Sequence, residues 1–194
     1  MKKKWHLILF LLAAIILLLI PLPASDLILR ITLTECYTDG FFLYYTTDGQ
    51  AWSEDQKIPG SLDAERGIVS FQVDSSLEGQ LTGLRIDFPN QQQVVCVKNI
   101  TVSSAGFPKK QYNPCVFFDV ANRKAQNGLY AVDLVPTRAR AYLGTTQEDP
   151  YVILSDVLTQ QITRLFSHYR MTRFFICLFV SACCLSCQKK LFKE

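Results

Sequence analysis

Residues 84–102, LRIDFPNQQQVVCVKNITV, show the pattern that most restricts how this chain can fold. Leu84, Ile86 and Phe88 alternate with polar residues, which predicts a β-strand with one buried face. Pro89-Asn90 follows directly. Because proline has no amide hydrogen to give to a sheet, and because the pair favours a turn, we expect the strand to end there.

A second apolar series follows the turn and consists of Val95, Val97, Ile100 and Val102. Its alternation slips by one residue at Lys98-Asn99. An extra residue of this kind is what a β-bulge inserts into a strand. The stretch therefore predicts two strands, the second of them bulged.

Other short apolar segments between turn residues are further strand candidates. They are Asp26–Thr34, Phe41–Thr46, Gly67–Val73, Val116–Phe118, Leu129–Leu134, Ala139–Leu143 and Tyr151–Leu154. Asp48-Gly49 has the turn chemistry of a hairpin that leads to Ala51–Ser53, and Ile58–Gly60 is expected to open a polar loop. Many short strands of this kind indicate a mainly β domain, a β-sandwich rather than a βαβ fold.

The pattern changes at Ser155 to a helical period. Leu158, Ile162, Leu165 and Tyr169 recur at helical spacing, with Ser155 or Asp156 as the expected N-cap. We expect this helix to run into the hydrophobic segment Phe174–Cys187.

The two ends of the chain predict membrane segments. Lys2-Lys3-Lys4 precede an uncharged run, Trp5–Leu22, which is either a signal-peptide core cleaved after Ala24 or an uncleaved anchor. Its 18 residues exceed a signal core of about 7–15 and favour the anchor. Phe174–Cys187 spans a bilayer only if flanking residues extend it; otherwise it lies on the membrane surface.

These segments divide the chain into three parts: an N-terminal anchor over 1–25, a β-domain over 26–154, and a helix with a second membrane segment and basic tail over 155–194. The basic residues flank the hydrophobic runs, which favours cytoplasmic termini and an extracytoplasmic domain at the cell membrane.

Charge and histidine content exclude several functions. Residues 26–163 contain 11 lysines and arginines against 16 aspartates and glutamates, a net charge of −5, which argues against nucleic-acid binding. The only histidines, His6 and His168, lie outside this region, which removes histidine-based nucleophilic catalysis and zinc sites. A glycosidase pair needs two carboxylates roughly 5–10 Å apart in a cleft, which a sequence does not show. We expect no catalytic residues.

The sequence gives only weak evidence for metal binding or redox chemistry. Asp39 and Asp48 lie in predicted loops and leave a calcium site open, but no DxDxDG-type run is present, and we expect no metal and no cofactor. Cys36, Cys96 and Cys115 allow one disulfide in the domain at most; as isolated cysteines they are more often small buried residues.

Residues 41–102 contain, in order, the segments FFLYYTTDGQAWSE, GIVSFQV, LTGLRIDFPN and a valine-rich strand that ends in KNITV. This order of segments resembles a module of bacterial multi-spanning envelope proteins of the glycosyltransferase or sugar-polymer assembly type. The resemblance implies a galactose-binding-like β-sandwich of the jelly-roll type, flanked by membrane helices, without a catalytic motif. Unlike those proteins, this chain does not continue through many spans.

Four residues are candidates for ligand binding. Trp52 and Tyr44 could form an aromatic platform, because sugar rings stack their apolar faces on aromatic rings, although such residues more often belong to a core. Adjacent Tyr45 points to the opposite face of the same strand, so at most one of the two tyrosines is well placed. Arg85 and Asp87 share a strand face and could bind a polar ligand, although an ion pair between them is the commoner arrangement.

Two hypotheses of function follow. The first is a membrane-anchored, non-catalytic, extracytoplasmic domain that recognises glycan or docks onto glycan-assembly machinery. The second is a structural or assembly subunit that binds a polytopic membrane protein. An envelope hydrolase is the least favoured class, because the domain has no histidine and no nucleophile motif.

Overall fold

The computed structural model describes residues 26–34, 39–47, 51–104 and 109–165. The two predicted membrane segments, the Asp48-Gly49 turn and Cys36 lie outside these residues. Within the described part of the chain, no helix has the length and apolar character needed to cross a bilayer. All described residues belong to one unit, Ser25–Phe166, which has its own core.

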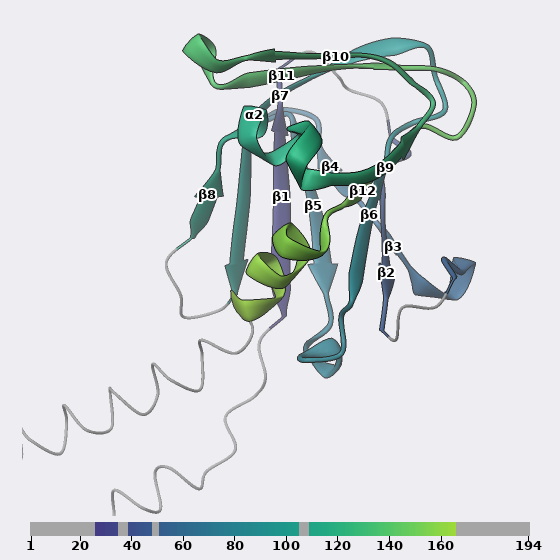
Figure 1. The fold of residues 1–194 in the computed structure, drawn as a ribbon, viewed down its shortest axis with the longest axis vertical. Coiled ribbons are helices and arrows are strands. Elements are labelled where there is room, and N and C mark those ends of the chain that lie inside the picture. The colour runs from purple at the N-terminus through teal and green to yellow at the C-terminus, as the bar shows by residue number, and fades with distance from the viewer. Residues whose placement is uncertain (1–25, 35–38, 48–50, 105–108, 166–194) are drawn as a thin grey trace, which may run out of the picture. The chain divides into compact units, whose positions relative to one another are not determined.

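The described residues form a mainly β structure, with 51% of them in strands and all strand pairs antiparallel. One sheet has the strand order β10 (Leu129–Val135), β11 (Arg140–Thr145), β7 (Gln93–Ser104), β1 (Leu27–Leu33), β5 (Ile68–Val73) and β4 (Ser61–Asp63), with β8 (Lys110–Tyr112) also paired to β7. We call it the seven-stranded sheet (Figure 1).

The second, or five-stranded, sheet has the order β3 (Lys57–Pro59), β2 (Phe42–Thr46), β6 (Gly83–Asp87), β12 (Tyr151–Leu154) and β9 (Arg123–Asn127). Short 3-10 helices connect the strands of the domain. They are η1 (Glu54–Gln56), η2 (Ser75–Leu77), η3 (Val120–Asn122) and η4 (Pro136–Arg138).

Both sheets contribute one face to a single hydrophobic core. In β1 every second residue from Leu27 to Leu33 is buried, as the alternation predicted. Val69, Phe71 and Val73 of β5 are buried in the same way. The other faces of these strands therefore remain available to polar residues.

The stretch 84–102 forms two strands, as predicted, but the strands lie in different sheets. The turn after Pro89 takes the chain from β6 in the five-stranded sheet to β7 in the seven-stranded sheet. The predicted bulge is present: Thr32 pairs with Asn99 and Leu33 with Val97, so Lys98 is the extra residue.

Two predicted elements near β2 are wrong. Ala51–Ser53 is not a strand, and the next strand along the chain that pairs with β2 is Lys57–Pro59. Ile58–Gly60 does not open a loop, because Ile58 and Pro59 belong to β3. Pro59 is tolerated there because β3 is the edge of its sheet and needs few amide donors.

The strand predicted at Val116–Phe118 is a helical turn instead. In α2 (Pro114–Phe117), Asn113 is the N-cap and its side chain accepts a hydrogen bond from the Cys115 amide at 2.9 Å. Phe117 and Phe118 are both fully buried. Their rings connect to Phe88 in the chain segment after β6.

The helix predicted after Ser155 is present over 156–165, and Ser155 is its N-cap: the Leu158 amide donates to Ser155 Oγ at 3.3 Å. Leu158 and Ile162 are buried in the core of the domain. The strands β8 and β9 were not predicted. Both are short or polar, and β9 has no buried residue to produce an apolar pattern.

Candidate functional site

The outward face of the five-stranded sheet gathers aromatic and charged side chains. In the register, Phe42 lies opposite Asp87, Tyr44 opposite Arg85, and Asp87 also lies opposite Tyr151. Their strand neighbours, such as Ile86, are in the core, so these five side chains share the face that points away from it. Tyr44 and Tyr45 occupy opposite faces, as predicted, because Tyr45 packs against the core.

Arg85 is the centre of this face. Its Nε and Nη2 donate to the two carboxylate oxygens of Asp87, each at 2.6 Å, and Nη2 also donates to Asp149 at 3.1 and 3.2 Å. The guanidinium carbon lies 3.8 Å from the ring centre of Tyr151 and 5.0 Å from that of Tyr44. The ion pair expected for Arg85 and Asp87 is therefore present, and aromatic rings flank it.

The Arg85–Asp87 pair is largely shielded from water: the side chains are 14% and 9% exposed. Burial raises the pKa of the Asp87 carboxyl, and the hydrogen bonds from Arg85 act against that shift. The two hydrogen bonds from Arg85 favour the ionised form of Asp87, which accepts hydrogen bonds and has no proton to donate to a substrate. The pair is suited to fixing a surface rather than to general acid catalysis.

The side chain of Asp149 reaches Arg85 because the backbone of Asp149 adopts an unusual conformation. Asp149 has a φ of 45°, in the left-handed region that few residues other than glycine adopt. The side-chain amide of Asn127 donates to the carbonyls of both Glu148 and Asp149 at 3.0 Å, which holds the loop before β12.

A second network lies at the β3 edge of the same face. The Tyr44 hydroxyl donates to Glu54 Oε1 at 2.7 Å, and Lys57 donates to Glu54 Oε2 at 3.0 Å. These two hydrogen bonds, that from Tyr44 first, lower the pKa of the Glu54 carboxyl. Burial and the bond to Glu54 raise the pKa of Tyr44. Lys57 also lies 4.0 Å from the ring centre of Phe42.

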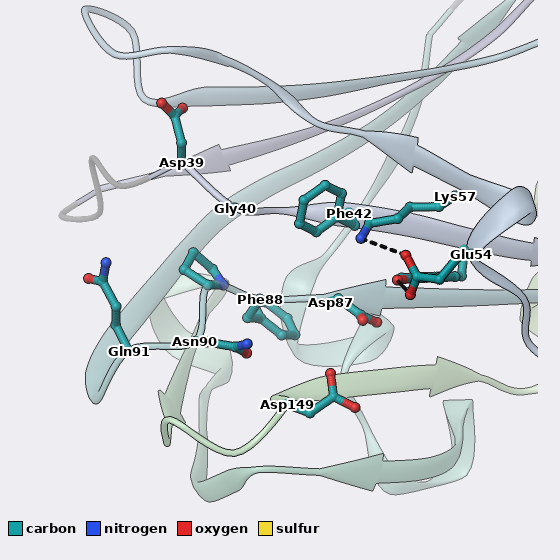
Figure 2. A pocket seen from close by; sticks show the side chains of 12 residues that line it. Asp39, Gly40, Phe42, Glu54, Lys57, Asp87, Phe88, Asn90, Gln91 and Asp149 are labelled. Carbon is teal, nitrogen blue, oxygen red and sulfur yellow. Dashed lines mark hydrogen bonds and ion pairs between the residues drawn. The ribbon is translucent and has the colours of Figure 1, made fainter.

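A cleft of about 440 Å³ opens beside these two networks, and we call it the β6-end cleft. Its lining residues are Asp39, Gly40, Phe42, Tyr44, Glu54, Lys57, Asp87, Phe88, Pro89, Asn90, Gln91 and Asp149. Figure 2 shows Asp87 and Asp149 in the same part of the cleft as the Lys57–Glu54 pair, with Asp39 and Gln91 toward the other end.

Trp52, the fourth residue named from the sequence, does not line the β6-end cleft. It lines a separate cleft of about 260 Å³, the Trp52 cleft, on the same sheet. The other lining residues are Thr46, Thr82, Gly83, Lys124, Ala125, Ile153, Leu154 and Asp156. The structure therefore brings together three of the four named residues, Tyr44, Arg85 and Asp87, and places the fourth apart.

The residues that the sequence did not single out are Glu54, Lys57, Asp149 and Tyr151. Each comes from a segment distant from β6, so only the strand pairing reveals them. Among the described residues, no three His, Cys, Asp or Glu side chains form a group that could hold a metal ion, and Cys96 and Cys115 are buried free thiols. Comparison with protein-family models, curated proteins and solved structures gave no match.

Proposed function

We propose that this protein is a membrane-anchored, non-catalytic, extracytoplasmic β-sandwich of the galactose-binding-like type that binds glycan on its five-stranded sheet. The two antiparallel sheets around one core support the sandwich. The basic, hydrophobic ends of the sequence support the anchoring and the extracytoplasmic placement. The domain either recognises the glycan itself or brings it to membrane machinery that builds it.

The observation that supports glycan binding best is the β6-end cleft. Sugar recognition needs aromatic rings for the apolar face of the sugar and fixed polar groups for its hydroxyls. Phe42 and Tyr44 supply rings in the lining of this cleft. Asp87 and Glu54 are carboxylates already held in place by Arg85 and Lys57, so little side-chain entropy is lost when a hydroxyl donates to them.

The charge of the cleft favours a neutral sugar. Its lining contains four carboxylates, those of Asp39, Glu54, Asp87 and Asp149, against one cation, Lys57. The adjacent Arg85 compensates part of that charge through its ion pairs. An acidic sugar or a phosphate would enter a negative surface, whereas hydroxyl groups can donate to the carboxylates without repulsion.

The test is a titration of the purified full-length chain in detergent with neutral saccharides: β-1,4-linked glucose, β-1,4-linked N-acetylglucosamine, galactose and mannose oligomers. Isothermal calorimetry would measure affinity. We expect saturable binding by at least one of them, and Phe42→Ala should weaken it about tenfold, the scale of one lost stacking contact. Tyr130→Ala is the matched control, because it removes an exposed ring from the other sheet.

Equal binding by Phe42→Ala and the unaltered protein would place the sugar elsewhere. If the unaltered protein, shown by circular dichroism to be folded, binds none of these saccharides, glycan recognition by this face is rejected.

One observation favours the alternative, a subunit that docks onto a polytopic membrane protein. Val94 and Tyr130 are 49% and 56% exposed on the seven-stranded sheet. Val94 pairs with Gly144, and a Cβ on Gly144 would come within 2.5 Å of the Tyr130 ring, so the two exposed side chains are neighbours. If this surface docks, Val94→Asp should abolish co-purification of a membrane partner, while Phe42→Ala should not.

A further inference from the structure

The Trp52 cleft lies over three neighbouring strands of the five-stranded sheet. Gly83 of β6, Ile153 of β12 and Ala125 of β9 line it, on the same outward face as Arg85 and Tyr151. Trp52 borders it on one side, and the ion pair between Lys124 and Asp156, at 3.2 Å, on the other. A depression on a sheet face therefore has an aromatic wall and a charged wall.

Gly83 is what allows Trp52 to lie against the sheet. A Cβ at position 83 would come within 2.6 Å of Thr46 Oγ1 and 3.1 Å of Trp52 Cη2. Any larger residue would push the indole away from β6. The half-buried Trp52 is thus held by close packing at one edge, which fixes a ring beside the cleft at little entropic cost.

The two clefts lie along the same strand. Asp87 lines the β6-end cleft and Gly83 lines the Trp52 cleft, and both face outward from β6. Four residues of extended strand separate them, roughly 13 Å. Between them, Arg85 lies against the rings of Tyr44 and Tyr151, so the surface that joins the clefts has two aromatic rings around a mostly buried guanidinium.

We propose that the two clefts are the two ends of one extended surface that binds a linear, neutral oligosaccharide of several rings along β6. Trp52 stacks on a ring at the far end, and Phe42 and Tyr44 contact the ring at the near end. This inference rests on the proposed function and adds the class of ligand: a chain rather than a single sugar, because a single ring reaches only one cleft.

The experiment compares chain lengths. The full-length protein is labelled with 5-fluorotryptophan, and Trp5→Phe assigns the two tryptophan signals in the ¹⁹F spectrum. The probes are neutral β-1,4-linked glucose and N-acetylglucosamine oligomers of one to six rings. We expect affinity to rise with length, and the Trp52 signal to shift only with the longer oligomers.

Two variants locate the far end. Trp52→Ala should weaken the longest oligomer about tenfold and leave the shortest binding oligomer unchanged. Ala125→Leu should do the same by filling the cleft without removing the ring, and Ala125 is exposed, so this substitution leaves the core intact. Phe42→Ala should weaken every length.

The outcomes separate the two proposals. Binding that does not depend on length, or that Trp52→Ala and Ala125→Leu leave unchanged, would overturn the extended surface and leave glycan binding at the β6-end cleft. Binding of no oligomer of any length would overturn both. Length dependence with a Trp52 shift and loss of only the longer ligands would establish the surface.

Discussion

Arg85 is the residue on which the outward face of the five-stranded sheet depends most. Replacing it with alanine leaves the Asp87 carboxylate, 9% exposed, without its partner. Breaking a buried pair from one side costs about 3–5 kcal/mol, and we expect Arg85→Ala to lower the free energy of unfolding by about 3 kcal/mol. Asp149→Ala should cost less than about 1 kcal/mol, because Asp149 is 61% exposed.

Urea denaturation of the full-length chain, followed by circular dichroism, measures both variants against the unaltered protein. Equal losses in the two variants would contradict the central role of the Arg85–Asp87 pair. A double variant, Arg85→Met with Asp87→Leu, should recover much of the stability, because it removes the buried charges together.

The lowered pKa of Glu54 predicts that the stability of the fold depends on pH. This pKa is lowered in the folded protein, first by the hydrogen bond from Tyr44 and then by that from Lys57. The unfolded chain therefore takes up this proton at a higher pH than the folded chain. The network stabilises the fold above the ordinary glutamate pKa, and this contribution is lost as the pH falls through the lowered value.

A ¹³C titration of the Glu54 carboxyl carbon checks that direction. Tyr44→Phe removes the hydroxyl but keeps the ring, so the pKa of Glu54 should rise toward its ordinary value while the cation–π contact with Lys57 is kept. An unchanged titration in Tyr44→Phe would show that the hydrogen bond does not determine the shift.

At the scale of single residues, the sequence predicted which near neighbours share a strand face, and it missed contacts between residues far apart in the chain. The two-residue spacing places Arg85 and Asp87 on one face, and adjacent Tyr44 and Tyr45 on opposite faces. Asp149 lies 64 residues from Arg85, and only the pairing of β6 with β12 brings it near. No local pattern contains that information.

At the scale of elements, α2 predicts a sharp contrast between two neighbouring residues. Phe118 is fully buried and packs against Phe88, whereas Val116 in the same turn is 58% exposed. Phe118→Ala should cost about 3–5 kcal/mol of unfolding free energy through the cavity it leaves. Val116→Ala should stay within about 0.5 kcal/mol. The same urea titration measures both, and comparable losses would mean that α2 does not close the core.

The α2 turn and β3 show why some elements escape prediction from sequence. Three apolar residues in a row fit a buried strand or a buried helical turn equally well, and the deciding signals, Asn113 and Pro114, lie upstream of the run. The strand β3 contains Pro59, a residue that reads as a breaker unless the strand is known to be an edge. A long alternation of apolar and polar residues such as that of β1 fits only a strand, and the strand predicted there is present.

At the scale of the whole molecule, the sequence predicted strands but not their sheets. Residues 84–102 read as two successive strands, and adjacent strands in a sequence often pair. Here the Pro89 turn instead connects two sheets, and β6 pairs with β2 and β12. The outward face, with both clefts, exists only because β6 pairs with β2 and β12. The candidate site therefore follows from the sheet topology more than from any motif.

The charge of residues 26–163 leads to the last prediction, which concerns acidic sugars. Their net charge is −5, and the β6-end cleft concentrates four of their carboxylates in one place. A uronic-acid oligomer should therefore bind more weakly than its neutral counterpart, most of all at low salt.

Removing one exposed carboxylate at the cleft edge, in Asp39→Asn, should improve uronate affinity about twofold in 0.1 M salt, as expected for one charge roughly 8 Å away in water. It should change the affinity for the neutral oligomer less, because a neutral sugar has no charge for the carboxylate to repel. Calorimetry at two salt concentrations measures both ligands, and Asp63→Asn, remote from the cleft lining, is the matched control. Tighter uronate than neutral binding would reverse the assignment of ligand charge and point to Arg85 and Lys57 as an anion site.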